Sequence, residues 1–285
     1  MVIRIVTDSG ADLSEEIVKD LNITVVPLHV LFGDKDYLDE VDITKEELYQ
    51  RLVQGPIHPT TSTAAPGEFI EVFRKLAAEG ADGIICISIT GKLSKTYGSA
   101  VQGKDIFEAS QGKTCKVAVI DSQAITMGIG LLVILAAKLV KEGKEFDSIV
   151  SAVQENISRI HTIGALDTLK YLVKGGRAPR VALVAGPLKI KTFVKVVDGE
   201  LHLMGAVRTQ QKKTEKLIDF VRQFPKDNLA AVAVEYSTDQ PEAQSLKDKI
   251  EKMFPKTPIY LARVGAALGV HGGPGTIIIN VETKK

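Results

Sequence analysis

The sequence predicts an α/β protein of two α/β domains, the first with a mainly parallel sheet and the second with a mixed or antiparallel sheet. In the first half of the 285-residue chain, short apolar runs alternate with helical patterns, the order that places parallel strands between covering helices. In the second half, Asp198-Gly199 lies between two apolar runs and predicts a hairpin, whose strands must be antiparallel. We therefore expect domains at residues 1–160 and 161–285, with a ligand between them.

The first domain is expected to alternate strands with helices. Its strands are apolar or β-branched runs at residues 2–7, 24–32, 83–88 and 116–120. Helical patterns cover residues 14–21, 44–54, 67–79, 94–109, 125–142 and 146–160. The helix at Thr44 begins with a capping box that ends at Glu47. Residues 33–42 are acidic and are expected to form a solvated loop, and the prolines of residues 55–66 exclude a central strand or a helix interior.

The second domain is expected to combine helices with antiparallel strands. A helix over residues 166–174 ends at Gly175-Gly176, a typical C-terminal stop, and Arg177 follows. The remaining elements are strands at 193–197 and 200–204, alternating helices and strands over 210–263, a glycine-rich loop at 265–275 and a last strand at 276–281.

The composition is typical of a soluble globular protein. Hydrophobic residues make up 45% of the chain and charged residues 25%, and the formal net charge of +1 gives no basic excess for nucleic acid. The most apolar stretch, residues 125–140, contains Lys138 and is shorter than the roughly 20 residues that span a membrane, so it predicts a buried helix. Cys86 and Cys115 lie in apolar runs, and the chain starts with a strand pattern instead of a signal peptide. These features predict a cytoplasmic location.

A hydroxyl-rich turn is predicted between the strand at 83–88 and the helix that follows it. Its hydroxyl residues are Ser88, Thr90, Ser94 and Thr96. Free backbone amides and the positive end of the helix dipole favour an anionic group at such a turn. Ser94 can equally be only the N-cap of the helix, because serine is a preferred cap. The turn alone leaves both interpretations open.

Other polar groups are predicted to face the same region. Hydroxyl residues crowd positions 60–63, Arg177 follows a helix stop, and His271 lies among glycines that let the backbone bend sharply. Ligands of parallel sheets bind beyond the carboxyl ends of the strands. Taken singly, Arg177 would be an ordinary surface charge and His271 a structural histidine. Taken together, these groups predict a polar, anion-binding cleft between the two domains.

Several catalytic and cofactor classes lack their sequence signals. The five histidines are scattered, without cysteine or carboxylate at ligand spacing, so we expect no metal site. No G-x-S-x-G elbow surrounds Ser94 or Ser122, and neither glycine motif of the common nucleotide-binding folds occurs, so we expect no cofactor. A small-molecule esterase or phosphotransferase that uses Ser94 and His271 stays open as the alternative function.

Six segments in chain order form a recognisable set. They are Thr7-Asp8-Ser9, Thr61-Ser62, Ser88 to Tyr97, Val119 to Ser122, Leu172 to Arg177 and Gly269 to Gly275. With these motifs the chain resembles the DegV family over its whole length. That family consists of bacterial proteins of two α/β domains that hold a fatty acid with its acyl chain inside and its carboxylate in the cleft between the domains. The resemblance implies a non-catalytic carrier of a long-chain fatty acid such as palmitate.

The resemblance also implies roles for individual residues. Thr61 and Ser94 would hydrogen-bond the carboxylate. Supporting polar contacts would come from Ser62, Arg177 and His271. The sequence departs from the family pattern at Thr63-Ala64-Ala65, which replaces the usual Gln-Pro-Ser, and at Gly91 and Lys95, which replace a serine and a glycine. The two primary hydroxyls are retained, whereas the rim around them differs.

In some members the carrier is the binding subunit of a fatty acid kinase, and the resemblance implies an ATP-binding kinase subunit as a partner. Four cations near the expected rim would attract an acidic partner through long-range electrostatics: Lys92, Lys95, Arg177 and Arg180.

The apolar helix at 125–140 is the expected wall of the acyl pocket, with Leu132 or Leu135 facing the acyl chain.

Overall fold

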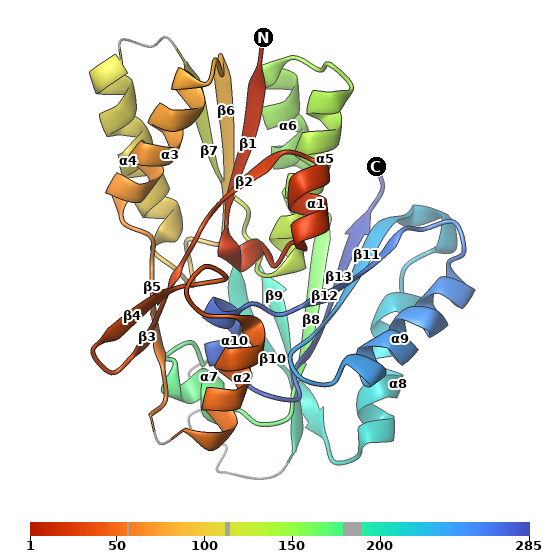
Figure 1. The fold of residues 1–285 in the computed structure, drawn as a ribbon. Helices are drawn as coiled ribbons and strands as arrows, with labels where there is room; N and C mark the ends of the chain where they lie inside the picture. Colours follow the sequence, from red (N-terminus) through yellow and green to blue (C-terminus); the bar gives the residue numbers. More distant parts are fainter. Residues whose placement is uncertain (56, 112–114, 179–189) are drawn as a thin grey trace.

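The computed structural model describes residues 1–55, 57–111, 115–178 and 190–285, and its central feature in the first half is a four-stranded parallel sheet (Figure 1). The strands, in their order across the sheet, are β2 (Ile23–Val26), β1 (Ile3–Asp8), β6 (Gly83–Ser88) and β7 (Lys116–Asp121). Neighbouring strands all pair in parallel. The predicted parallel sheet is confirmed.

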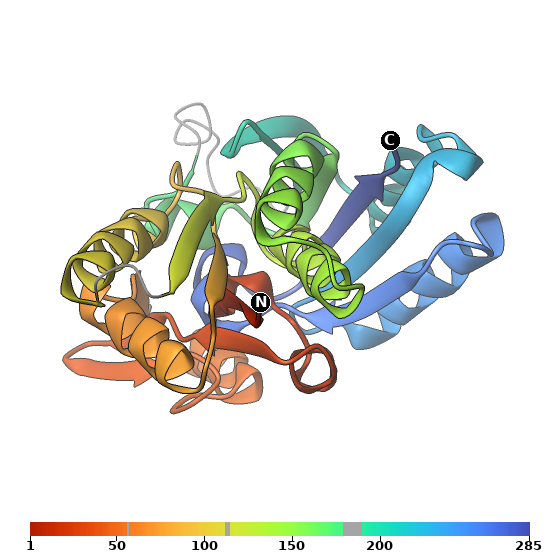
Figure 2. The ribbon, with the colours of Figure 1, turned by 90° about the horizontal axis from the view of Figure 1, so that it is seen from above.

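Helices cover both faces of this sheet (Figure 2). On one face, α3 (Pro66–Ala78) and α4 (Thr96–Gln111) pack on Ile84 and Cys86 of β6. On the other, α1 (Glu15–Asp20), α5 (Met127–Lys141) and α6 (Phe146–Ile157) pack on Ile85 and Ile87 of the same strand. Because both faces are covered, β6 reads as a continuous apolar run instead of an alternating one.

The second half is built on a six-stranded mixed sheet. Its strands, in their order across the sheet, are β10 (Glu200–Val207), β9 (Lys191–Val197), β8 (Ile160–Leu166), β13 (Ile277–Thr283), β11 (Leu229–Tyr236) and β12 (Ile259–Arg263). All neighbours pair antiparallel except β11 and β12. Helices α8 (Gln210–Arg222) and α9 (Gln240–Met253) pack on one face of it. The mixed sheet is confirmed, and the domain boundary at residues 160 and 161 stays a prediction.

Helix α5 lies between the two sheets and contacts both β1 and β11. A helix that is enclosed on all sides has no polar face to maintain. This position explains why residues 125–140 are the most apolar stretch of the chain. Among the described residues, no helix is both long and apolar enough to cross a membrane.

A third, three-stranded antiparallel sheet was not predicted. The run at 24–32 forms two strands, because Pro27 has no amide for a ladder and ends β2 before β3 (His29–Phe32) begins. Strand β3 pairs with β4 (Lys35–Leu38) and with β5 (Thr60–Ser62). The expected solvated loop at 33–42 and the expected loop at 55–66 therefore each contribute a strand, and β5 lies at the sheet edge.

Two further predictions were wrong in the second half. Residues 160–166 form β8, whereas helices had been expected to reach Ile160 and to start at Leu166; α7 covers only Lys170–Lys174. The expected loop at 265–275 contains helix α10 (Ala266–Gly272). Gly269 suits this helix because a Cβ there would lie 2.6 Å from the hydroxyl of Tyr49, on α2 (Lys45–Gln54). Gly269 therefore allows α10 to pack closely against α2.

The predicted hairpin at Asp198-Gly199 is confirmed and connects the two halves of the molecule. Both residues have positive φ, 48° and 79°, as a tight two-residue turn between twisted strands requires. The Thr90 hydroxyl, on the loop after β6, donates a hydrogen bond of 3.1 Å to the Gly199 carbonyl. The tip of the hairpin therefore packs against the hydroxyl-rich turn of the first half.

We predict that Gly199→Ala destabilises the protein by about 1–3 kcal/mol, because an alanine is strained at positive φ and its Cβ would lie 2.3 Å from the Thr90 hydroxyl oxygen. Gly143→Ala is the matched control, since Gly143 has φ of 74° and open space around it. Chemical denaturation of both variants measures the difference. Equal losses of unfolding free energy in Gly199→Ala and Gly143→Ala would contradict the prediction, because the contact with Thr90 would then add nothing to the effect of backbone strain.

Candidate functional site

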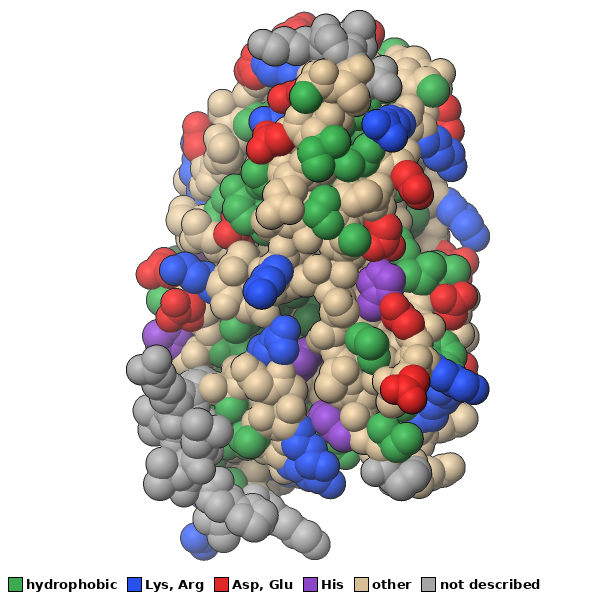
Figure 3. Space-filling model, turned by 90° about the vertical axis from the view of Figure 1, so that its left-hand side faces the viewer, with side chains coloured by type: hydrophobic (Ala, Val, Ile, Leu, Met, Phe, Trp, Pro, Cys, Tyr) green, Lys and Arg blue, Asp and Glu red, His purple; other side chains and the backbone are tan. Residues whose placement is uncertain are grey.

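A cavity with a mostly apolar lining lies between the six-stranded sheet and loops of the first half of the chain. Its walls come from β8, β9, β10 and β13, from the residues just before α5 and from α10. The predicted site residues Thr61, Ser62, Ser94, Arg177 and His271 all line it. On the face shown in Figure 3, a hollow near the middle is bordered by basic side chains and a histidine. The structure therefore brings the five predicted residues to one cavity, although they come from four separate parts of the chain.

Thr61 and His271 contact each other directly. The Thr61 hydroxyl, on β5, lies 2.9 Å from Nε2 of His271, on α10. Burial and, after it, the nearby charge of Arg177 lower the pKa of His271 to about 3. The ring is therefore neutral at pH 7 and can donate or accept one hydrogen bond at Nε2. Its buried Nδ1 has no hydrogen-bond partner among the described residues.

Ser94 lies on the turn before α4. Its hydroxyl is 2.8 Å from the Thr96 hydroxyl and accepts a 3.2 Å hydrogen bond from the Thr96 amide. The helix begins at Thr96, so Ser94 satisfies the first helical amide from two residues upstream. The capping interpretation and the binding interpretation are therefore compatible, since Ser94 also lines the cavity.

Arg177 connects the turn that carries Ser94 to the end of α7. Its Nε donates to the Leu93 carbonyl at 3.3 Å, and Nη1 donates to the Gly175 carbonyl at 2.8 Å. These bonds fix the half-buried guanidinium at the cavity and leave other donors free to face it. Ser62 is exposed, Lys92 and Lys95 are exposed near the same turn, and Arg180 lies outside the described residues.

Helix α10, which carries His271, is held at its start by two buried carboxylates. Asp39 accepts hydrogen bonds from the amides of Ala266 and Ala267, at 3.0 and 3.2 Å, and Asp12 accepts one from Gly265 at 2.8 Å. Burial raises the pKa of Asp39 to about 6. This role of Asp39 was not predicted, because Asp39 falls in the acidic stretch at 33–42 that is expected to form a solvated loop.

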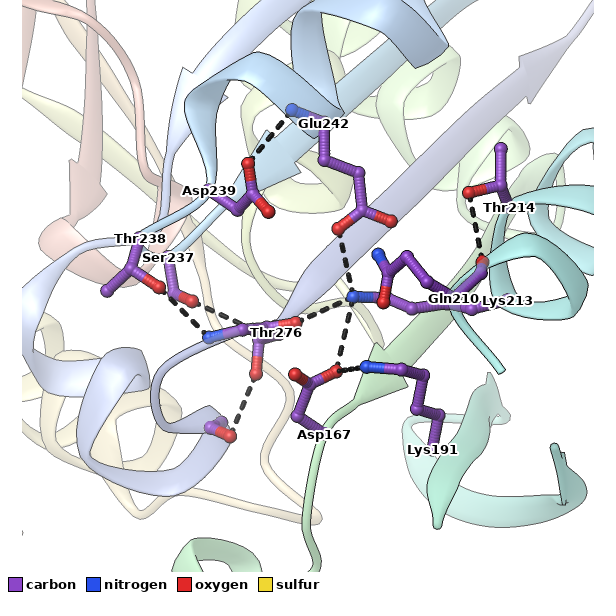
Figure 4. Close-up of polar contacts among 12 residues, drawn as sticks. Asp167, Lys191, Gln210, Lys213, Thr214, Ser237, Thr238, Asp239, Glu242 and Thr276 are labelled. Atoms are coloured by element: carbon purple, nitrogen blue, oxygen red, sulfur yellow. Dashed lines mark hydrogen bonds and ion pairs between the residues drawn. The ribbon is translucent and has the colours of Figure 1, made fainter. Parts of the chain in front are cut away.

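The segment after α10 is held by a buried lysine (Figure 4). Lys213, on α8, is 1% exposed, and its ammonium donates to the Gly275 carbonyl at 2.9 Å. It also pairs with Asp167 at 3.3 Å and with Glu242 at 3.1 Å, so all three of its protons have acceptors. Both ends of α10 are thus tied to other elements, which fixes the position of His271.

The prediction that the helix at 125–140 forms the wall of the cavity through Leu132 or Leu135 is wrong. Leu132 packs in the core between α5 and the sheets, and neither it nor Leu135 lines this cavity. Only Ile125 and Thr126, which precede α5, reach it. The main apolar wall is the face of the six-stranded sheet. This wall is not predicted from the sequence, because the patterns at residues 160–166 indicate helix instead of the strand β8.

A Ser94–His271 catalytic pair is not assembled. The hydrogen bonds of these two side chains go to Thr96 and Thr61, and none joins Ser94 to His271 in the described part of the chain. A serine nucleophile needs a base within hydrogen-bond reach. The geometry thus provides hydrogen-bonding groups around an apolar cavity.

Comparison with known proteins identifies the family. A family model described as an uncharacterised protein of the DegV family matches residues 2–284. The chain belongs to the DegV family. A DegV domain-containing protein of Caldanaerobacter subterraneus subsp. tengcongensis is 37% identical to it over 284 residues, which cover 99% of each chain.

Two similar solved structures have the same fold. A fatty-acid-binding protein of Eubacterium ventriosum, described as binding stearic acid, is 29% identical, with a TM-score of 0.91 over 99% of this chain and 98% of the other. A DegV protein of Thermus thermophilus, described by its fatty acid binding, is 28% identical, with a TM-score of 0.87 over the whole of both chains.

We predict that Gly175→Ala moves the pKa of His271 from about 3 toward its ordinary value near 6.5, since a Cβ at residue 175 would lie 2.0 Å from Nδ1 and would push the ring out of its buried position. NMR titration of the histidine ring signals measures this shift. Gly98→Ala is the control, because nothing lies within 4 Å of a Cβ there. A ring that stays neutral down to pH 4 in Gly175→Ala would contradict the prediction.

Proposed function

We propose that the protein binds a long-chain fatty acid, with the acyl chain in the cavity and the carboxylate held by Thr61 and Ser94. The observation that carries the proposal is a cavity with a mostly apolar lining that also includes two hydroxyls, a neutral imidazole and a guanidinium, from Thr61, Ser94, His271 and Arg177. Similar solved structures described by their fatty acid binding support it.

The two parts of such a ligand have different requirements, and the cavity offers both. Burying a methylene group gains about 0.8 kcal/mol, so a sixteen-carbon chain gains on the order of 10 kcal/mol in an apolar cavity. A buried carboxylate needs hydrogen-bond donors in compensation. Thr61 and Ser94 would supply them directly, and Arg177 and His271, with Ser62 at the exposed edge, would support them.

A direct test is denaturing mass spectrometry of organic extracts from the freshly purified protein. Stoichiometric fatty acid supports the carrier. A protein that contains no fatty acid, takes none up and cleaves model esters would instead support the esterase that uses Ser94 and His271.

We predict that Ser94→Ala and Thr61→Val each weaken fatty-acid binding by roughly tenfold to a hundredfold, because a hydrogen bond to a charged group is worth about 1.5–3 kcal/mol. Titration calorimetry measures both affinities, and thermal unfolding controls for loss of fold. Ser99→Ala, on α4 and outside the cavity lining, is a control for the serine substitution. Unchanged affinity in both site variants would remove the carboxylate from this position.

We further propose that the bound carboxylate is presented to an ATP-binding kinase subunit, with Lys92 and Lys95 guiding the encounter. Neither common phosphate-binding glycine motif occurs in the sequence.

We predict that the protein with ATP and Mg²⁺ forms acyl phosphate only after such a subunit is added. The double variant Lys92→Glu/Lys95→Glu should slow the coupled reaction more at low than at high salt. Acyl phosphate formed by this chain alone, detected by phosphorus NMR, would show that it is itself an enzyme.

A further inference from the structure

Gly164 is a glycine in the middle of a central strand, where the residue type is unfavourable. It lies in β8, between β9 and β13, and is buried. A glycine inside a strand is destabilising relative to alanine and often marks a place where a ligand approaches the backbone closely. Its φ is not in the left-handed region, so the backbone itself does not require glycine.

The strand register places Gly164 on the cavity face of the sheet. Its cross-strand neighbours are Val194 on β9 and Ile278 on β13, and all three residues line the cavity. Ile163 and Ala165, the residues on either side of Gly164, point to the opposite face and belong to the core under α8 and α9. The glycine thus leaves a gap between two branched side chains in the wall of the cavity.

The gap is open toward the cavity. A Cβ built on Gly164 would lie 3.2 Å from Cγ2 of Val194 and 3.8 Å from Cγ1 of Ile278, and no other atom would lie within 4 Å. Both contacts are lateral, along the row of paired residues across the sheet. No side chain from α5 or α10 lies within 4 Å of this Cβ.

Gly164 also lies midway along the cavity face of β8. At one end of β8, Leu166 is followed by Asp167, and the chain continues through α7 to Arg177. Arg177 lines the cavity together with Thr61, Ser94 and His271. At the other side Thr162 donates a 2.6 Å hydrogen bond to Asn280, which in turn donates to the hydroxyl of Thr126 at 3.2 Å. These bonds fix the positions of the two threonines, which both line the cavity.

Resting on the proposed function, we infer that Gly164 is the specificity-determining residue for acyl-chain length. The chain of an unbranched fatty acid passes from the polar groups over Gly164, through the gap between Val194 and Ile278, and toward Thr162. A side chain at residue 164 would close this passage. Short acids, whose chains end before it, would still bind, whereas long acids would lose the part of the cavity beyond it.

The test compares decanoate with hexadecanoate in titrations of the wild type, Gly164→Ala and Gly164→Val. We expect the ratio of the two affinities, long over short, to fall several-fold in Gly164→Ala and more than tenfold in Gly164→Val, with decanoate affinity little changed. Gly164→Ala keeps the protein folded, because alanine suits a strand better than glycine and its Cβ meets no backbone atom within 4 Å. Gly98→Ala, outside the cavity, is the matched control.

A second variant separates passage of the chain from general disturbance of the sheet. Val194 supplies the atom nearest to the added Cβ, so Gly164→Ala/Val194→Ala should restore most of the long-chain affinity. An unchanged affinity ratio in Gly164→Ala and Gly164→Val, while the wild type binds hexadecanoate, would overturn the inference and leave the proposed function standing. A wild type that binds neither acid would overturn both.

Discussion

Carboxylates from distant parts of the chain cap two helix N-termini, and the cavity depends on these interactions. The residue before α10, Gly265, has no side chain to cap the helix, and Asp39 and Asp12 accept its first hydrogen bonds instead. Thr126, before α5, makes no capping bond with its side chain either, and Glu235 accepts from the Met127 amide at 3.2 Å. The start of α10 is thereby fixed to loops of the first half and the start of α5 to β11 of the second half, so local helix stability is coupled to the assembly of the two halves.

These caps carry an electrostatic cost that the surrounding groups reduce. Burial raises the pKa of Asp12, Asp39 and Glu235, the last to about 7, because desolvation disfavours their charged forms. Lys45 lies beside this group and favours the ionised forms of Asp12 and Glu235. Asn280 donates a 2.6 Å hydrogen bond to Glu235. The network therefore combines helix dipoles, one cation and an amide to retain carboxylates in the interior.

Local patterns predicted the elements whose signals are local. The Asp198-Gly199 turn, the continuous apolar run of β6 and the Thr44 N-cap lie where the sequence indicates. The third sheet was missed because the run at 24–32 predicts one strand although Pro27 divides it, and because β4 and β5 are mostly polar. Strand β8 was missed because Gly164 interrupts its strand pattern, and tertiary pairing overrides such an interruption. Thr61, Ser94, Arg177 and His271 were found as hydroxyls, a helix stop and a glycine-flanked histidine. Lys213 and Asp39 were missed because their partners are distant in sequence.

The placement of the two cysteines has a practical consequence for experiments on this protein. Cys86 and Cys115 are both buried, and burial raises the pKa of each thiol, so the reactive thiolate form is suppressed. The full sequence contains no other cysteine. A cysteine introduced at an exposed position beside the cavity, such as Lys95, would therefore be the one that a maleimide fluorophore modifies in the folded protein. Ligand exchange can be followed with such a probe while both native thiols are retained.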